Sequence, residues 1–147
     1  MEKNICVPGF LANGMASGIK ADGSKDLSLI YSSVPAHAAG VFTTNRFKAA
    51  PVILDMERIT RGCIQAIVVN SGNANASTGD AGYEDACAMS RAVSQALKID
   101  EDLVLVASTG VIGKKLPVEK ILENMGSLVG GLSESGLPSA EEGIMTT

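Results

Sequence analysis

The residues with the clearest chemical potential lie where an apolar run ends. Residues 104–113 read VLVASTGVIG, so the run breaks at Ser108, Thr109 and Gly110. A hydroxyl beside an unhindered glycine backbone suits a tight turn, a phosphate-binding loop or a hole for an oxyanion. In an oxyanion hole, the Thr109 hydroxyl and the Gly110 N–H would both donate to the oxygen of a tetrahedral acyl intermediate.

The phosphate-binding interpretation has the least support. A Walker loop requires G-x-x-x-x-G-K-[S/T], but Gly110 and Gly113 are too close together and no hydroxyl residue follows Lys114 and Lys115. The dinucleotide fingerprint G-x-G-x-x-G is absent as well. A tight turn would explain the glycines and leave Thr109 without a role, so the turn and the oxyanion hole both stay open on chemistry alone.

A second candidate is the polar segment 70–79, NSGNANASTG, which follows another apolar run. Its three asparagines can bond to their own backbone, which predicts a connection held by Asx turns. Alternatively, its small residues would let a ligand approach the backbone closely, at the strand end where α/β sheets often bind ligands. The pattern is compatible with both interpretations.

Metal and thiol chemistry have little support. Cys6, Cys63 and Cys87 stand far apart without a C-x-x-C pair, and His37 is the single histidine, so we expect no metal site. Cys87 falls on a helical stripe of small residues and is expected to be a buried thiol. A nucleophilic pair of one cysteine with His37 remains the alternative to threonine chemistry.

The elements that must position these residues predict a mixed α/β fold. Residues 27–32 and 40–44 are rich in β-branched and aromatic types and predict two strands joined by a turn at Pro35. Residues 51–54 form a third short apolar run. Residues 64–69 and 103–107 are nearly continuous in apolar types, as in central strands that are covered on both faces.

Two segments have helical periodicity. Residues 80–98 predict a helix that Thr78 or Asp80 can cap. A second helix is expected from Pro117 to the pair Gly130 and Gly131. Its apolar stripe comprises Val118, Ile121, Leu122, Met125 and Val129. A linker at 133–139 leads to the start of a short acidic helix at 140–142, and the whole chain 1–147 is expected to be one domain.

Composition limits the classes of partner. The chain has 147 residues, of which 46% are apolar, and a net charge of −4, which argues against nucleic-acid or anionic-membrane partners. No apolar run approaches the roughly 20 residues of a membrane span. The start, MEKNICVPGFLANG, lacks the pattern of a signal peptide. We therefore expect a cytoplasmic protein.

Five motifs carry a family resemblance. In chain order they are GFLANG at 9–14, AGVFTTNRFKAAP at 39–51, VVNSGNANA at 68–76, ASTGVIG at 107–113 and IMTT at 144–147. In this order and spacing, the chain resembles the glutamate N-acetyltransferases of arginine biosynthesis, also called ornithine acetyltransferases. The resemblance implies their fold, a layered α-β-β-α sandwich that is also described as DmpA-like.

The resemblance also implies a chemistry. In this family a precursor cleaves itself before a threonine, which becomes the first residue of a second (β) chain and carries acetyl from N-acetylornithine to glutamate. By resemblance, Thr109 and Gly110 stabilise the oxyanion, and the partner is that β chain in a hetero-oligomer of α and β chains. No cofactor is implied, although some members accept acetyl-CoA as a co-substrate.

The chain departs from the family at its end. Members continue past IMTT through a Lys-Gly segment to the cleavage point, whereas this sequence stops at Thr147. We expect it to be the N-terminal (α) part, truncated before the cleavage site and inactive alone. Thr147 best matches a substrate-binding threonine and Thr146 is second, a frayed terminus being the alternative. The competing function is a non-catalytic α/β domain that binds a small anion or a partner at 70–79 and 108–110.

Overall fold

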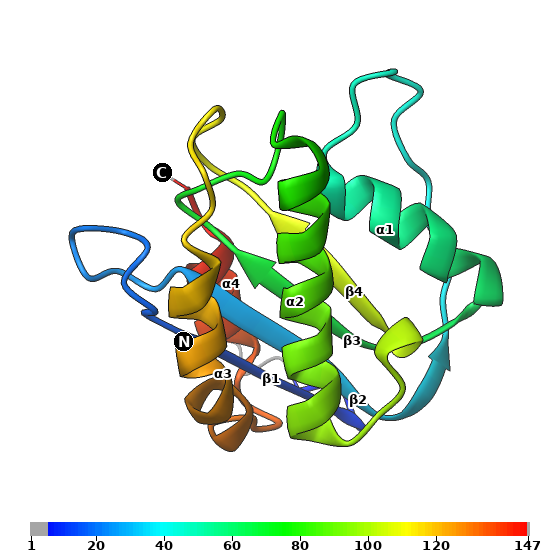
Figure 1. Ribbon diagram of the computed structural model, residues 1–147. Coiled ribbons are helices and arrows are strands. Elements are labelled where there is room, and N and C mark those ends of the chain that lie inside the picture. The colour runs from blue at the N-terminus through cyan, green and yellow to red at the C-terminus, as the bar shows by residue number, and fades with distance from the viewer. Residues whose placement is uncertain (1–5, 147) are drawn as a thin grey trace.

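The computed structural model of the chain describes residues 6–146 (Figure 1). A four-stranded sheet in the order β1-β2-β3-β4 consists of β1 (Phe10–Met15), β2 (Leu27–His37), β3 (Cys63–Asn70) and β4 (Val104–Ser108). The helices are α1 (Ala50–Arg58), α2 (Gly79–Leu97), α3 (Val118–Gly130) and α4 (Leu137–Ile144), with single 3-10 turns at Ile59–Arg61 and Glu101–Leu103. β1, β2 and β3 are antiparallel neighbours, and β3 and β4 are parallel.

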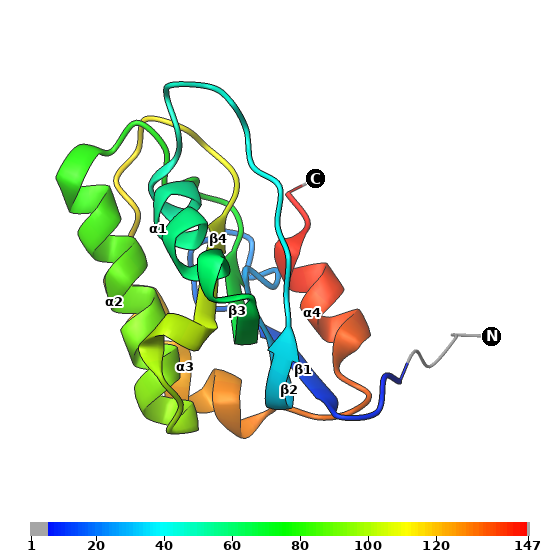
Figure 2. The same ribbon diagram turned by 90° about the vertical axis from the view of Figure 1, so that its right-hand side faces the viewer.

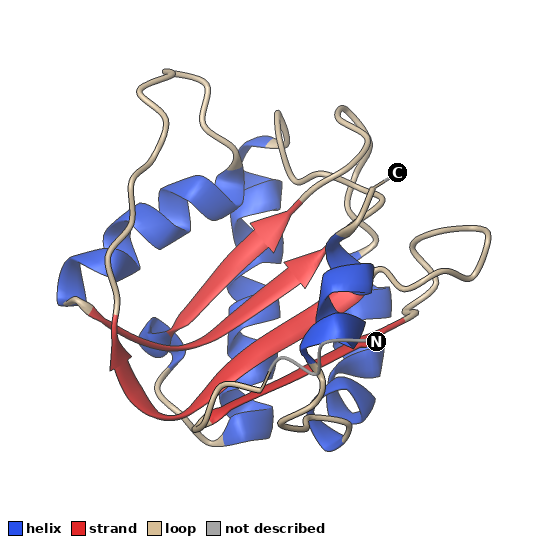
Figure 3. Cartoon of the chain, turned by 180° about the vertical axis from the view of Figure 1, so that it is seen from behind, coloured by secondary structure: helices blue, strands red, loops and turns tan. Residues whose placement is uncertain are grey.

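Helices lie on both faces of the sheet, as Figures 2 and 3 show. α1, α2 and α3 cover one face, and α4 packs on the other face over β1 and β2. The expected α/β class is therefore confirmed, and the described residues form one sheet between two helical layers. None of the helices in residues 6–146 is long and apolar enough to cross a bilayer.

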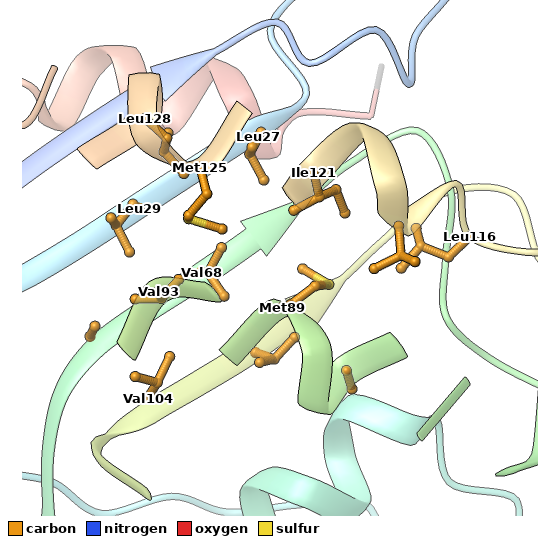
Figure 4. Close-up of a cluster of buried hydrophobic side chains, with 14 of the residues drawn as sticks. Leu27, Leu29, Val68, Met89, Val93, Val104, Leu116, Ile121, Met125 and Leu128 are labelled. Atoms are coloured by element: carbon orange, nitrogen blue, oxygen red, sulfur yellow. The ribbon is translucent and has the colours of Figure 1, made fainter. Parts of the chain in front are cut away.

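The hydrophobic core lies between the sheet and the three-helix layer (Figure 4). Alternation along each strand directs every second side chain to this face. The fully buried apolar side chains that meet here include Leu27, Leu29, Val68, Val104, Met89, Val93, Ile121 and Leu128. Burial of each such side chain stabilises the fold by about 1.5–3 kcal/mol, so this layer holds the strand ends in place.

The strongest sequence patterns are confirmed. β3, β4, α2 and α3 lie within one or two residues of their predicted bounds, because the strands are nearly continuous apolar runs and the helices have a clear apolar period. On α3, however, Leu128 is fully buried while Leu122 is 37% exposed, so the stripe is rotated slightly from the predicted one. Thr78 does precede α2, but its hydroxyl bonds to Asn75 Oδ1 (2.7 Å) instead of capping the helix.

The structure differs from the sequence-based expectations at four places. Residues 40–44 form no strand, and β2 instead continues through Pro35, at a break in pairing with β3 between Tyr31 and Ala36 where no N–H is needed. Residues 51–54 belong to α1, since Pro51 in the first turn favours helix. The strand β1 was not predicted, and α4 begins at Leu137 rather than at 140.

Side chains of α1 cover the outer edge of β4. Asp55 Oδ1 accepts the Val106 N–H at 3.0 Å, and Arg58 Nη1 donates to the Val104 carbonyl at 2.6 Å. Arg58 also pairs with Glu101 at 3.1 Å. Burial raises the pKa of Asp55 to about 6, although the Val106 N–H and Arg58 partly oppose this. Within residues 6–146, β4 has no strand partner on this side, and these contacts take up its backbone N–H and carbonyl groups there.

Candidate functional site

The candidate site is built where β3 and β4 end side by side. Because these strands are parallel and Asn70 is in register with Ser108, the following loops 71–78 and 109–117 leave from the same edge of the sheet (Figures 1 and 3). The Thr109 N–H donates to the Asn70 carbonyl at 3.0 Å. A further parallel bridge between Asn73 and Val111 extends the pairing into both loops.

Gly110 occupies a position that excludes other residues. Its φ of +132° is disfavoured for L side chains, and a Cβ atom there would lie 2.5 Å from Asn73 N and overlap the carbonyl carbon of Gly72. The two loops therefore touch through their backbones. Within residues 6–146, neither the Gly110 N–H nor the Thr109 hydroxyl has a hydrogen-bond partner, which leaves both donors available.

Three of the four predicted site residues line one hollow. Thr109, Gly110 and Thr146 border it together with Gly72 and Val111, around a volume of about 350 Å³. Thr147 lies outside the described residues. All five lining residues are uncharged, so developing negative charge in this hollow would meet neutral dipoles.

Strand alternation separates Thr109 from Ser108. Val104, Val106 and Ser108 share the face that α1, α2 and α3 cover, and Thr109 follows with its side chain exposed. The hydroxyl of Ser108 and the Oδ1 of Asn70 are buried without a hydrogen-bond partner among residues 6–146. An unpaired buried polar atom typically costs about 1–3 kcal/mol, so this strand end carries a cost that an apolar pair would avoid.

The segment with Thr146 is held near the hollow by α4. The helix lies against the sheet backbone at Gly14, where an added Cβ would be 2.5 Å from the Ser139 carbonyl carbon. Ser71 Oγ donates to the Gly143 carbonyl at 2.7 Å. Lys20 Nζ donates to the Met145 carbonyl at 2.5 Å, which ties the end of α4 to the loop after β1.

Asp26 organises that loop and was not identified from the sequence. It is fully buried, and its two carboxylate oxygens accept four hydrogen bonds from Ser17 N (2.6 Å), Ser17 Oγ (2.8 Å), Ile19 N (2.7 Å) and Lys20 N (2.9 Å). Its carbonyl accepts the Ser71 N–H at 2.8 Å. A lone aspartate just before an apolar strand is the only signal that the sequence offered.

The asparagines of the segment 70–79 point inward. Asn70, Asn73 and Asn75 are buried, and their side-chain amides donate to the carbonyls of Asn73 (2.8 Å), Lys114 (3.0 Å) and Gly82 (2.7 Å), respectively. Side-chain-to-backbone bonds therefore hold this connection, but their donors are the amide groups and two acceptors, Lys114 and Gly82, lie outside the segment, so these bonds are not the expected Asx turns. From this segment, Gly72 lines the hollow, through its backbone.

The cysteine alternative lies at the other end of the sheet. Cys63 is the first residue of β3 and pairs in register with His37, whereas Thr109 follows the last residues of β3 and β4. Eight strand residues separate these ends by roughly 23 Å. Cys87 is half-buried on α2, and burial raises the pKa of its thiol, which disfavours the nucleophilic thiolate.

Comparison with known proteins gives consistent matches. A sequence model of the ArgJ family matches residues 11–147. The arginine biosynthesis bifunctional protein ArgJ of Caldanaerobacter subterraneus subsp. tengcongensis is 55% identical over 139 residues, which are 95% of this chain and 34% of that protein. The protein of the same name from Geobacter sulfurreducens is 51% identical over 141 residues, covering 96% and 36% of the two chains. The chain thus spans about a third of the length of these curated relatives.

Solved structures match over almost the whole chain. The ornithine acetyltransferase of Mycobacterium tuberculosis, crystallised with ornithine, superposes with a TM-score of 0.93 at 41% identity, covering 99% of this chain and 81% of that one. The ArgJ structure from Bacillus halodurans gives a TM-score of 0.89 at 38% identity, with coverage of 99% and 78%. The expected resemblance of the fold is therefore confirmed.

Proposed function

The chain belongs to the ArgJ family, and on that premise we propose that it supplies the oxyanion-stabilising part of an acetyltransferase of arginine biosynthesis. The acetyl group passes from N-acetylornithine to glutamate. One observation carries this proposal: the unengaged donors of Thr109 and Gly110 border the same uncharged hollow as Thr146.

The chemistry requires such donors twice. In the first half-reaction a threonine hydroxyl attacks the acetyl carbonyl of N-acetylornithine, a C–O bond forms, and the C–N bond breaks as ornithine leaves with the proton. In the second, the glutamate amine attacks the ester carbonyl, a C–N bond forms, and the C–O bond breaks as the threonine oxygen takes back a proton from the amine. Each attack places negative charge on the carbonyl oxygen, and prepositioned N–H and O–H donors stabilise it without reorganisation.

The nucleophile belongs to the part of the protein that this chain does not cover. We assign it to the N-terminal threonine of a companion β chain, whose α-amino group serves as the base, so that α and β chains together form the active hetero-oligomer. Thr146, or Thr147 beyond the described residues, contacts the amino-acid substrate. Acetyl-CoA is an alternative acetyl donor, no other cofactor is needed, and the enzyme acts in the cytoplasm.

Replacing Thr109 in the complete enzyme tests the proposal. Thr109→Ala should lower kcat by roughly 10²–10³, because the lost donor acts on the transition state. KM for N-acetylornithine should change much less. Thr109→Ser retains the hydroxyl and is the matched control, with kcat expected within about tenfold of the parent enzyme.

Two results would contradict the proposal. An unchanged kcat in Thr109→Ala would remove this residue from the chemistry. If mass spectrometry finds no acetyl-threonine intermediate after incubation with N-acetylornithine, while ornithine still binds, the non-catalytic binding domain becomes the better description of this chain.

A further inference from the structure

Asn70, the last residue of β3, bonds to both loops that form the candidate oxyanion hole. It is fully buried, and its carbonyl accepts the Thr109 N–H at 3.0 Å. Its side-chain Nδ2 donates to the Asn73 carbonyl at 2.8 Å. The reverse amide orientation would set Oδ1 against that carbonyl, so the direction of the side chain is fixed.

The loop that Asn70 holds is the one against which Gly110 rests. An atom added at the Gly110 Cβ position would be 2.5 Å from Asn73 N. On either side of this contact, Val111 N donates to the Gly72 carbonyl at 3.5 Å and Ala74 N donates to the Val111 carbonyl at 3.0 Å. A shift of the 72–73 backbone therefore changes the direction of the Gly110 N–H.

The same residue thus controls both proposed donors by separate routes. Its carbonyl fixes the peptide before Thr109, and its side chain fixes the backbone that supports Gly110. The Oδ1 atom is buried and has no hydrogen-bond partner in residues 6–146. Among these residues, the bond from Nδ2 to the Asn73 carbonyl is therefore the one that the Asn70 side chain makes.

We propose that Asn70 is a positioning residue of the oxyanion hole: its amide sets the loop that orients the Gly110 N–H beside the Thr109 hydroxyl. The proposal rests on the acetyltransferase function above. Asn70 touches no substrate, and its effect passes through the geometry of the two donors, for which a displacement of about 1 Å can cost on the order of a hundredfold in rate.

A matched pair of variants in the complete enzyme tests this role. Asn75 is an equally buried asparagine of the same loop, but its Nδ2 donates to the Gly82 carbonyl in the first turn of α2, away from Gly110. Asn70→Ala should lower kcat roughly 10- to 100-fold with KM within about threefold. Both alanine variants should lower the melting temperature by similar amounts, but Asn75→Ala should leave kcat within about threefold of the parent enzyme. Asn70→Ser and Asn75→Ser form a milder pair if an alanine variant does not fold.

A double-mutant cycle with Gly110→Ala separates the possible failures. If the Asn70 amide acts through the Gly110 N–H, Asn70→Ala should lower kcat clearly less in a Gly110→Ala enzyme than in the parent enzyme. Equal losses of kcat in the Asn70 and Asn75 variants, or full additivity with Gly110→Ala, would overturn the positioning role. An unchanged kcat in Thr109→Ala itself would instead overturn the function on which it rests.

Discussion

At two borders of the same sheet, different kinds of side chain bond to the backbone N–H and carbonyl groups. At the carboxyl ends of β3 and β4, neutral amides and hydroxyls hold the chain: Asn70 and Asn73 bond to loop carbonyls, and Ser71 bonds to α4. Along the outer edge of β4, charged side chains do so: Asp55 accepts from Val106, and Arg58 donates to Val104. We refer to these as the neutral border and the charged border.

The difference follows from what each border must leave free. On the proposed function, an ionised side chain near Gly110 would compete for its N–H or oppose the negative charge of the acyl intermediate. Along the edge of β4, an ion pair of Arg58 with Glu101 completes the bonding. The neutral border is therefore expected to control the rate, and the charged border to control stability and its dependence on pH.

The largest effect is expected from closing the contact at the neutral border. Gly110→Ala places a methyl group against Gly72 and Asn73 and should reduce kcat by 10²-fold or more, because the loops must separate. Gly113 also has a positive φ (+82°), but a Cβ there meets nothing within 4 Å. Gly113→Ala should therefore cost about 1 kcal/mol of stability and leave kcat nearly unchanged. Comparable kcat losses in both would show that backbone strain, not the loop contact, is responsible.

The charged border should reveal itself in unfolding experiments. Arg58 is 6% exposed, so Arg58→Ala leaves the Val104 carbonyl without its donor and should lower the free energy of unfolding by about 2–3 kcal/mol in urea. Arg61, which is 51% exposed and pairs with Asp100 at 3.6 Å, is the control, and its alanine variant should lose less than about 1 kcal/mol. A fall in kcat per folded Arg58→Ala molecule would contradict the assignment of rate to the neutral border and stability to the charged border.

The smallest effect is a pH dependence at Asp55. Its folded pKa of about 6 exceeds the ordinary aspartate pKa of 3.8, so between these values the folded state binds more protons and stability falls as pH rises. Asp55→Asn keeps an oxygen for Val106 N–H without the charge. The variant should gain on the order of 1 kcal/mol relative to the parent at pH 7, after allowance for partial exposure, and almost nothing near pH 4. A difference that is constant from pH 4 to pH 7 would contradict this assignment.

The sequence predicted the elements whose apolar patterns are unbroken. β3 and β4 are nearly continuous apolar runs and α2 and α3 have helical periodicity, whereas β1, FLANGM, contains Asn13 and Gly14, and α4 opens with Leu-Pro-Ser. Residues 40–44 have strand-forming types, but no segment within residues 6–146 pairs with them as a strand, and Val41 is 99% exposed. Local propensity cannot supply a missing partner strand.

The site was accessible to sequence only through its motif. Ser-Thr-Gly after a buried strand suggested two donors, and the family resemblance gave them a role. The convergence of Gly72, Thr109 and Thr146 on one hollow depends on segments that are far apart in the chain, which no local pattern encodes. Asp26 and the inward-facing Asn70 act through backbone bonds; residue type marked the asparagine as able to form such a bond, but not which carbonyl it would reach.

The contact of α4 with β1 at Gly14 joins segments that are synthesised at different times, so it limits when this hollow can form. Ser139 Oγ donates to the Gly14 carbonyl across a separation of 125 residues. At the usual pace of translation, roughly 5–20 residues per second, β1 has emerged about 6–25 s before its helical partner is made. The hollow that Thr146 borders therefore cannot form until synthesis has passed α4. A nascent chain that still lacks α4 has the two donors of Thr109 and Gly110 but not the segment with Thr146 that borders the same hollow.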